Sequence, residues 1–244
     1  MKAKLWALVR LFAVQGSWNY ERMLGLGLGY SALPLLEELS RTDPARYRDA
    51  VGRAGEFFNC NPNLAGIALG ASVRAEQEGL PGAQIVRLKT ALGGPLGALG
   101  DRLFWAGVVP GLSALAVAAV ALGAGLVAPI AMVALYLVLR ILVGRWALTL
   151  GLREGLSVGR ALATSWLSPA AERAGLVAAL CVGVMLPLAG WWLLGGGSLK
   201  EILLAGALAL AGTVLAVRRV SGYSSVRLTL AVGVVVLLLG MAVR

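Results

Sequence analysis

The sequence contains no histidine. This absence excludes a phosphohistidine on this chain, a histidine proton relay, and any Ser-His-Asp or Cys-His nucleophilic site. No Gly-Lys-Ser/Thr follows a glycine-rich loop, which excludes a phosphate-binding P-loop. The two cysteines, Cys60 and Cys181, have neither metal-ligand nor CxxC spacing. We therefore expect no disulfide framework, no metal and no cofactor.

Charged residues are also few, at 14% of the chain, while 59% of the residues are hydrophobic and the mean hydropathy is +0.81. A soluble domain has roughly 25% charged and 45–50% apolar residues, so we predict an integral membrane protein. The 22 basic residues outnumber the 12 acidic ones and lie between apolar runs. This arrangement is typical of loops near anionic lipid headgroups, and no nucleic-acid partner is expected.

Long apolar runs dominate the second half of the chain. Residues 107–143 are long enough for two membrane spans divided near Gly123–Pro129, and residues 174–196 make a third. Residues 201–217 and 228–243 make a fourth and a fifth, each near the short limit. We predict an all-α integral membrane protein with about five transmembrane helices, plus N-terminal amphipathic and re-entrant or broken helices.

The distribution of basic residues predicts the orientation of these spans. Arginine and lysine gather in residues 74–102, 144–173 and 218–227, whereas the two short turns between them carry only Lys200. The positive-inside rule therefore places the three basic segments in the cytoplasm.

The N-terminal part is predicted to contain shorter helices. Residues 2–14 form an amphipathic helix suited to the membrane interface and are not expected to be a cleaved signal peptide. Residues 24–36 and 63–73 are apolar but too short to span a bilayer alone. Residues 43–57 predict a charged helix outside the bilayer core, with Asp43 as its N-cap.

A glycine-rich stretch, Gly93–Gly100, precedes Asp101. We predict a break in the helix here, as in the broken helices of transporters. Asp101 would then either cap a helix that begins at Leu103 or accept hydrogen bonds from a ligand. A salt bridge with Arg87 or Lys89 belongs to the first alternative.

A second polar interruption, Glu56-Phe-Phe-Asn-Cys-Asn-Pro62, also stands out from its apolar surroundings. Asn59 and Asn61 each offer a donor and an acceptor, and they suit both a hydroxyl-rich solute and the capping of helices at a break. Gln15 and Ser17 add hydrogen-bonding groups. Aromatic side chains available to stack on a sugar ring are Tyr20, Phe57, Phe58, Phe104 and Trp105.

Two carboxylates, Glu76 and Glu78, stand two residues apart. Side chains at this spacing on a helix do not face each other, so we predict a solvated face rather than a catalytic pair. With no histidine and an isolated Cys60 as the available nucleophile, an intramembrane enzyme is not expected.

Three blocks of the sequence resemble the enzyme IID component of the mannose/fructose/sorbose family of the bacterial phosphotransferase system (PTS). These blocks are Gln15–Met23, Glu56–Pro62 and Leu88–Trp105, with weaker similarity at Ala128–Arg140 and Gly151–Gly155. Together they extend the resemblance over essentially the whole chain.

The resemblance implies a non-catalytic membrane subunit in the bacterial cytoplasmic (inner) membrane. It would form the path for a hexose or related sugar with a second membrane subunit, IIC, as a trimer of IIC–IID heterodimers with an elevator-like movement. Phosphate would come from cytoplasmic IIA and IIB proteins, which is consistent with the missing histidine. Residues 1–106 would carry the sugar-site motifs and residues 107–244 the transmembrane region, within a single membrane domain. The implied substrate-binding residues are Asn59, Cys60, Asn61, Asp101, Gly100, Gln15 and Ser17.

The chain departs from the family pattern at three places. The family usually has threonine where this chain has Cys60, and serine or proline where it has Arg102. A polar insertion between the last spans is reduced here to Gly195–Leu199. These departures keep an alternative open, namely a non-transporting membrane sensor or scaffold derived from the same family.

Overall fold

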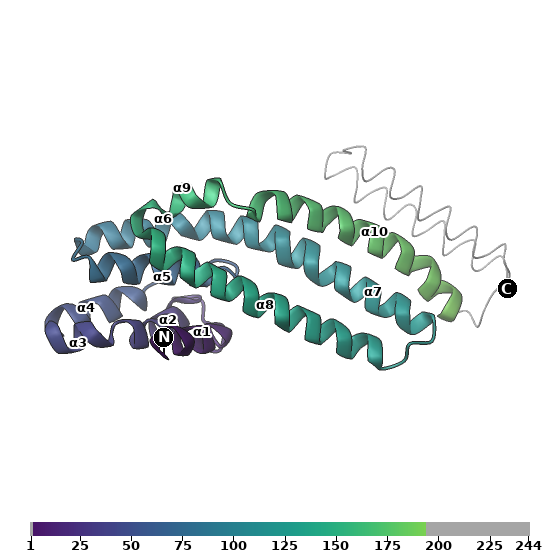
Figure 1. Ribbon diagram of the computed structural model, residues 1–244, viewed down its shortest axis with the longest axis horizontal. Coiled ribbons are helices and arrows are strands. Elements are labelled where there is room, and N and C mark those ends of the chain that lie inside the picture. Colours follow the sequence, from purple (N-terminus) through teal and green to yellow (C-terminus); the bar gives the residue numbers. More distant parts are fainter. Residues whose placement is uncertain (1, 194–244) are drawn as a thin grey trace. The chain divides into compact units, whose positions relative to one another are not determined.

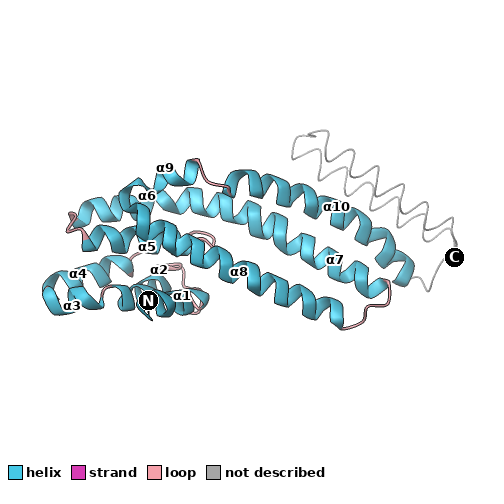
Figure 2. Cartoon of the chain, viewed as in Figure 1, coloured by secondary structure: helices cyan, strands magenta, loops and turns pink. Residues whose placement is uncertain are grey.

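The computed structural model describes residues 2–193, and every regular element among them is a helix (Figure 1). Figure 2 shows the same chain with helices in cyan and no strand in the described part. The predicted all-α class is confirmed for these residues. The predicted spans at 201–217 and 228–243 lie outside the described residues, so the number of five transmembrane helices stays a prediction.

The N-terminal helix α1 (Lys2–Phe12) is amphipathic, as predicted. It packs on α2 (Gly25–Ala32) and on the 3-10 helix η1 (Leu33–Leu35) through a buried face that consists of Ala7, Leu8 and Leu11. Its other face exposes large apolar side chains, namely Leu5, Trp6 and Val9. Exposed apolar residues beside Lys2 and Lys4 suit a helix that lies in the membrane interface.

Four short elements follow: α2 (Gly25–Ala32), η1 (Leu33–Leu35), α3 (Glu37–Thr42) and α4 (Pro44–Ala54). The predicted cap of α4 is confirmed, because Asp43 Oδ1 accepts a 2.9 Å hydrogen bond from the backbone nitrogen of Arg46. Helix α4 ends at Ala54, three residues before the predicted end.

The glycines of α2 allow another backbone to approach closely. A Cβ atom at Gly25 would lie 2.1 Å from the carbonyl oxygen of Glu56, and one at Gly27 would lie 2.1 Å from that of Val14. Contacts this short exclude any side chain. Helix α2 is therefore held directly against the segment that precedes Asn59.

Helix α5 (Ala65–Gln77) packs on α8 (Val127–Glu154) in the same way. A Cβ atom at Gly70 would lie 2.6 Å from the carbonyl oxygen of Leu148, and one at Gly151 would lie 2.3 Å from that of Ile67. Small residues that let two helix backbones meet are typical of helix pairs in membranes.

Helix α6 (Gly82–Gly100), the π-helix η2 (Asp101–Val108) and α7 (Val109–Ala121) form one helical run of 40 residues. The predicted break at Gly93–Gly100 is therefore wrong, because the helix continues through Pro95. Three glycines of this stretch, Gly93, Gly97 and Gly100, give room to the neighbouring residues Asn59–Asn61 and do not turn the chain.

The predicted division of residues 107–143 into two helices is confirmed by the turn between α7 and α8. Two glycines of this turn adopt positive φ angles, +97° at Gly123 and +55° at Gly125. After α8 come the 3-10 helix η3 (Gly155–Ser157), α9 (Val158–Ala163) and α10 (Leu167–Leu193).

Three helical runs among the described residues are long and apolar enough to cross a membrane. They are Gly82–Ala121, Val127–Ala163 and Leu167–Trp192. The last of them contains most of the third span predicted from the sequence, residues 174–196, whose end lies outside the described residues. Within it, Ala178 of α10 lies 3.4 Å from the position of a Cβ atom at Gly111 of α7.

The chain forms two compact units. Among the described residues, one unit consists of residues 2–106 and 135–173, and the other of residues 107–134 and 174–193. The three crossings between the units lie inside η2, α8 and α10. Continuous helices, not loops, therefore connect them. The division of the sequence into a motif-bearing region 1–106 and a transmembrane region 107–244 stays a prediction.

Candidate functional site

One face of α6 lies against the polar segment Asn59–Asn61. A Cβ atom at Gly93 would lie 3.1 Å from the first residue of the segment, and one at Gly97 would lie 3.9 Å from the second. A Cβ atom at Gly100 would lie only 2.2 Å from the Cβ of the third. The glycines follow one another at about one helical turn. The segment therefore runs alongside α6, one residue to each turn of the helix.

Asn61 organises this segment from the inside. The residue is 1% exposed. Its Nδ2 donates a 2.9 Å hydrogen bond to Asp101 Oδ1, and its Oδ1 accepts 3.1 Å hydrogen bonds from the backbone nitrogen and from Nδ2 of Asn63. Both ends of the amide are thus engaged by the protein. In this conformation Asn61 is a buried scaffold for its neighbours.

Asp101 presents the polar group of this cluster to the outside. It is exposed and is the first residue of η2, at the point where the helix changes from α to π. Its predicted role as the cap of a helix that begins at Leu103 is wrong, because the helix is continuous here. No salt bridge to Arg87 or Lys89 forms within residues 2–193. π-helical turns are frequent at functional sites.

The other residues of the two motifs differ in their exposure. Asn59 is exposed, whereas Gly100 and Cys60 are buried. The Cys60 thiol donates to the carbonyl oxygen of Asn61 at 3.2 Å. Burial raises the pKa of the Cys60 thiol well above its ordinary value, and the negative charge of Asp101 adds to this shift. Cys60 is therefore a neutral thiol that faces into the segment.

Gln15 and Ser17 lie in the exposed turn after α1. Among residues 2–193 no hydrogen bond connects their side chains to the Asn61 cluster. The end of the same block does reach it: the backbone nitrogen of Leu24 donates to Phe58 O at 2.9 Å, and that of Phe58 donates to Arg22 O at 3.3 Å. The structure therefore joins the first two motif blocks through their backbones.

The aromatic residues of the motifs divide into two groups. Phe58 and Phe104 are 2% and 1% exposed and belong to the core, so their predicted role in stacking on a sugar is wrong. Phe57 and Trp105 are 59% and 48% exposed, and Tyr20 is 83% exposed. These three stay available for stacking on a ligand.

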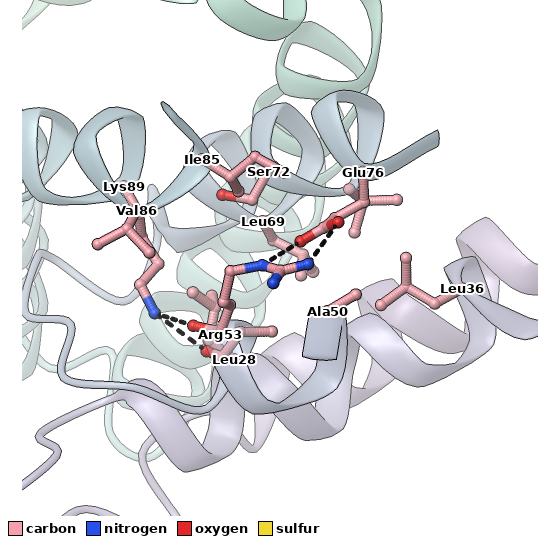
Figure 3. Close-up of a pocket in the computed structure, with 12 residues that line it drawn as sticks. Leu28, Leu36, Ala50, Arg53, Leu69, Ser72, Glu76, Ile85, Val86 and Lys89 are labelled. Atoms are coloured by element: carbon pink, nitrogen blue, oxygen red, sulfur yellow. Dashed lines mark hydrogen bonds and ion pairs between the residues drawn. The ribbon is translucent and has the colours of Figure 1, made fainter. Parts of the chain in front are cut away.

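A buried charged cluster lies beside this site, between α4, α5 and α6 (Figure 3). The guanidinium of Arg53 donates two hydrogen bonds to the carboxylate of Glu76, at 2.8 and 2.9 Å, and Arg46 lies 3.7 Å from the same carboxylate. These bonds raise the pKa of Arg53, against the opposing effect of burial. Glu76 is 3% exposed, so the predicted solvated position of this carboxylate is wrong.

Lys89 is the other buried charge of the cluster, at 3% exposure. Its ammonium donates to the carbonyl oxygens of Arg53, Ala54 and Glu56, the last two at 3.4 and 3.2 Å. Figure 3 shows its side chain reaching from α6 toward the end of α4. Carbonyl groups at the C-terminus of a helix lack donors within the helix, and the ammonium of Lys89 is a donor for those at the end of α4.

Two hollows among the described residues bear on the site, and neither is lined by the seven predicted substrate-binding residues. The cavity within the charged cluster encloses about 20 Å³, which is room for a water molecule but not for a sugar. An open groove of about 560 Å³ lies near the start of α1 and is lined by side chains that include Lys4, Glu38 and Arg74. In the described part of the chain, no group of three or more Cys, Asp or Glu side chains could hold a metal ion.

Sequence reasoning missed Asn63, Lys89 and the Arg53–Glu76 pair. Asn63 follows Asn61 by two residues, as Asn61 follows Asn59, and this repeat could have indicated that Asn63 belongs to the same polar cluster. Lys89 interrupts a stripe of buried α6 residues that consists of Ile85, Leu92 and Leu96. A lone lysine on such a stripe indicates a buried charge that has a partner.

Comparison with known proteins supplies a family. A family model described as "PTS system mannose/fructose/sorbose family IID component" matches residues 2–189. The chain is 29% identical over 177 residues to the mannose-specific EIID component of Escherichia coli K12, which covers 70% of this chain and 62% of that protein. It is 28% identical over 176 residues to the fructose permease IID component of Bacillus subtilis 168, covering 70% and 63%. The chain thus spans less than two thirds of the length of these relatives.

Two solved structures share the fold. One is a chain of the mannose transporter ManYZ in complex with microcin E492, with a TM-score of 0.59 and 22% identity. The other is described only as the structure of a membrane protein, with a TM-score of 0.69 and 24% identity. Each comparison covers 96% of this chain and 95% of the other.

Proposed function

Because the chain belongs to the mannose/fructose/sorbose family of PTS IID components, we propose that it is the IID half of a sugar transporter in the cytoplasmic membrane. It would work with a IIC subunit, and a IIB protein would phosphorylate the sugar at the inner face. The observation that carries this proposal is the cluster of Asn59, Asn61 and Asp101 against α6, which lies in the blocks that resemble the family.

The chemistry of this cluster suits a neutral, hydroxyl-rich solute. An exposed carboxylate at Asp101 can accept hydrogen bonds from two sugar hydroxyls, and the exposed amide of Asn59 can both donate and accept. Phe57 and Trp105, exposed on the neighbouring parts of the chain, can stack on the apolar face of a sugar ring. We assign Asn61, Cys60 and Gly100 to the scaffold that holds these groups. Gln15 and Ser17 would contact the sugar only at the outer edge of the site.

The sugar site is proposed to be completed by the IIC subunit. Asn59 and Asp101 are exposed, and neither of the two hollows described above is lined by the predicted site residues, so the polar cluster has an open side. The described helices also expose many large apolar side chains, among them Ile130 and Leu137 of α8 and Leu176 and Leu180 of α10. Lipid and a second membrane subunit are the two environments that accept such surfaces. A trimer of IIC–IID heterodimers is consistent with this arrangement.

An elevator-like movement is part of the same proposal. The chain forms two compact units, and it passes between them inside three helices. One of these crossings lies in η2, a few residues after Asp101. A π-helix is rare and interrupts the regular ladder of α-helical hydrogen bonds, so we propose η2 as a place where the helical run bends during transport.

The proposal is tested by expressing the chain with a IIC subunit and measuring sugar binding and flux in vesicles. We expect the two chains to purify together and to bind a hexose, and we expect Asn59→Ala to weaken binding without separating the subunits. Absence of flux and of binding for every hexose and amino sugar tried would overturn the proposal.

Recovery of the folded chain without a IIC-like partner would favour the alternative of a non-transporting sensor or scaffold. The burial of the Cys60 thiol weighs against that alternative, because this departure from the family pattern does not alter the exposed groups of the cluster.

A further inference from the structure

Lys89 stands in an unusual position for a lysine of a mainly apolar helix. Its neighbours on the same face of α6 are Ile85, Leu92 and Leu96, all buried. The transfer of an ammonium group from water to such surroundings is costly unless the group is fully hydrogen-bonded. A leucine or methionine would pack here without that cost, so the charge itself has a role.

The partners of Lys89 define that role. All three of its hydrogen bonds go to backbone carbonyl groups at the end of α4 and just beyond it, those of Arg53, Ala54 and Glu56. The C-terminus of a helix carries a partial negative charge and unpaired carbonyl groups. Lys89 therefore caps α4 from another helix and holds the chain just beyond its end.

The end of α4 sets the path of the next segment of the chain. The residues after Glu56 run beside α6 through Asn59–Asn61, in step with Gly93, Gly97 and Gly100. Lys89 lies one turn before Gly93 on the same helix. The ammonium contact is thus the first of a series of contacts, and the Asn61–Asp101 hydrogen bond is the last.

We infer that Lys89 is a positioning residue for the Asn59–Asn61 segment: by capping α4 it holds the segment in register along α6, and so places Asn61 beside Asp101. This inference rests on the proposed function in one respect only, namely that the segment forms part of a sugar site. The register itself is a property of the chain that is measurable without any sugar.

The thiol of Cys60 is a reporter inside this segment. It is 8% exposed in the intact structure. The experiment measures the rate of maleimide labelling of Cys60 in the full-length chain, in the membranes in which it is expressed and in a Cys181→Ser background. The variants are Lys89→Met, Lys89→Gln and Lys89→Arg. Arg87→Met is the matched control, because Arg87 is exposed on the same helix two residues earlier.

We expect labelling to accelerate by about tenfold or more in Lys89→Met, since loss of the cap allows the segment to open locally. Lys89→Gln keeps one or two hydrogen-bond donors, so Cys60 should be labelled at an intermediate rate. Lys89→Arg keeps the charge and should keep Cys60 protected from labelling. Arg87→Met should label at the rate of the parent chain. A second reporter, Ser31→Cys, lies at a fully buried position of α2 and should stay protected in every variant, which separates local opening from unfolding.

The outcomes are decisive in both directions. Equal labelling of Cys60 in Lys89→Met and the parent chain would overturn the inference. If Lys89→Met does not fold, the Gln variant decides, and an unchanged rate there has the same meaning. If both reporters become labelled together, Lys89 supports the whole fold and the positioning role is wrong. A parent chain that binds no sugar would overturn the proposed function but leave the labelling result intact.

Discussion

Asn61 donates a 2.9 Å hydrogen bond to the carboxylate of Asp101, 40 residues farther along the chain. One partner is buried and the other is exposed. The bond therefore links the interior scaffold of the motif segment to the charged group that faces outward. It also ties that segment to the first residue of η2, where the α-helix changes to a π-helix.

Two substitutions of Asp101 test the charge of its side chain separately from its hydrogen bond to Asn61. In Asp101→Asn the side-chain oxygen still accepts from Asn61, so we expect little loss of thermal stability. The loss of a charged acceptor for sugar hydroxyls should weaken sugar binding by about tenfold. In Asp101→Ala the buried Nδ2 of Asn61 loses its acceptor, and a loss of about 1–3 kcal/mol of stability should accompany the weaker binding. Thermal unfolding and sugar titration of the two variants check both expectations.

Gly100 and Gly94 form a matched pair on α6. A Cβ atom at Gly100 would lie 2.2 Å from the Cβ of Asn61, while one at Gly94 would meet nothing within 4 Å. We expect Gly100→Ala to destabilise the chain by about 1–3 kcal/mol through overpacking. Gly94→Ala should be neutral or stabilise it by up to about 1 kcal/mol, because alanine is the better helix former. Equal effects of the two substitutions in chemical denaturation would contradict the close packing of α6 on the segment.

The Cys60 thiol should resist alkylation even in alkaline solution. Burial raises the pKa of this group, so the folded chain keeps the thiol protonated at a pH where an exposed cysteine is a thiolate. The unfolded chain ionises at the ordinary pKa, and the stability associated with Cys60 is therefore present below that value and declines as the pH rises above it. Labelling with iodoacetamide between about pH 7 and 9.5, native and denatured, tests this expectation in the Cys181→Ser background.

The Arg53–Glu76 pair should respond more strongly to single than to double substitution. Either Arg53→Met or Glu76→Gln leaves a buried charged group without its main partner, at a cost of about 3–5 kcal/mol. The combination of Arg53→Met with Glu76→Gln removes both charges of the pair, and its cost should be well below the sum of the two single costs. A double-mutant cycle followed by denaturation measures this coupling.

The exposed pair Arg41–Glu37 provides the control for this cycle. Its side chains are 74% and 65% exposed, although the ion pair itself is short, at 2.6 Å. We expect Arg41→Gln to change stability by no more than about 0.5 kcal/mol. A large effect here would mean that charge in general, and not burial, determines the outcome.

Local signals in the sequence were sufficient for several elements. Asp43 followed by Pro44 predicted the start of α4, and the glycine-rich turn after α7 separated two helices as expected. The amphipathic pattern of α1 was also recognisable. Each of these features depends on residues within one or two turns of each other, so the sequence carries the whole of the information.

Long-range contacts account for the errors. The stretch Gly93–Gly100 was predicted to break the helix because glycine and proline are poor helix formers. Its glycines instead make room for Asn59–Asn61, a partner that lies more than thirty residues earlier and that local spacing does not reveal. Glu76 was predicted to be solvated for the same reason, since its partner Arg53 lies 23 residues away.

The candidate site was predicted in composition but not in geometry. Asn59, Asn61 and Asp101 were selected from the sequence, and the structure brings Asn61 and Asp101 into contact. Which of the three faces outward was not predictable, because exposure depends on how α6 packs on the segment.

The glycine series on α6 also limits how this region can vary in length. One residue inserted between Lys89 and Asp101 would rotate the rest of the helix by about 100° and shift it by about 1.5 Å. Every glycine beyond the insertion would then leave the face that meets Asn59–Asn61. A substitution in α6 thus disturbs one contact of the series, whereas a change in the number of residues would dismantle the site as a whole.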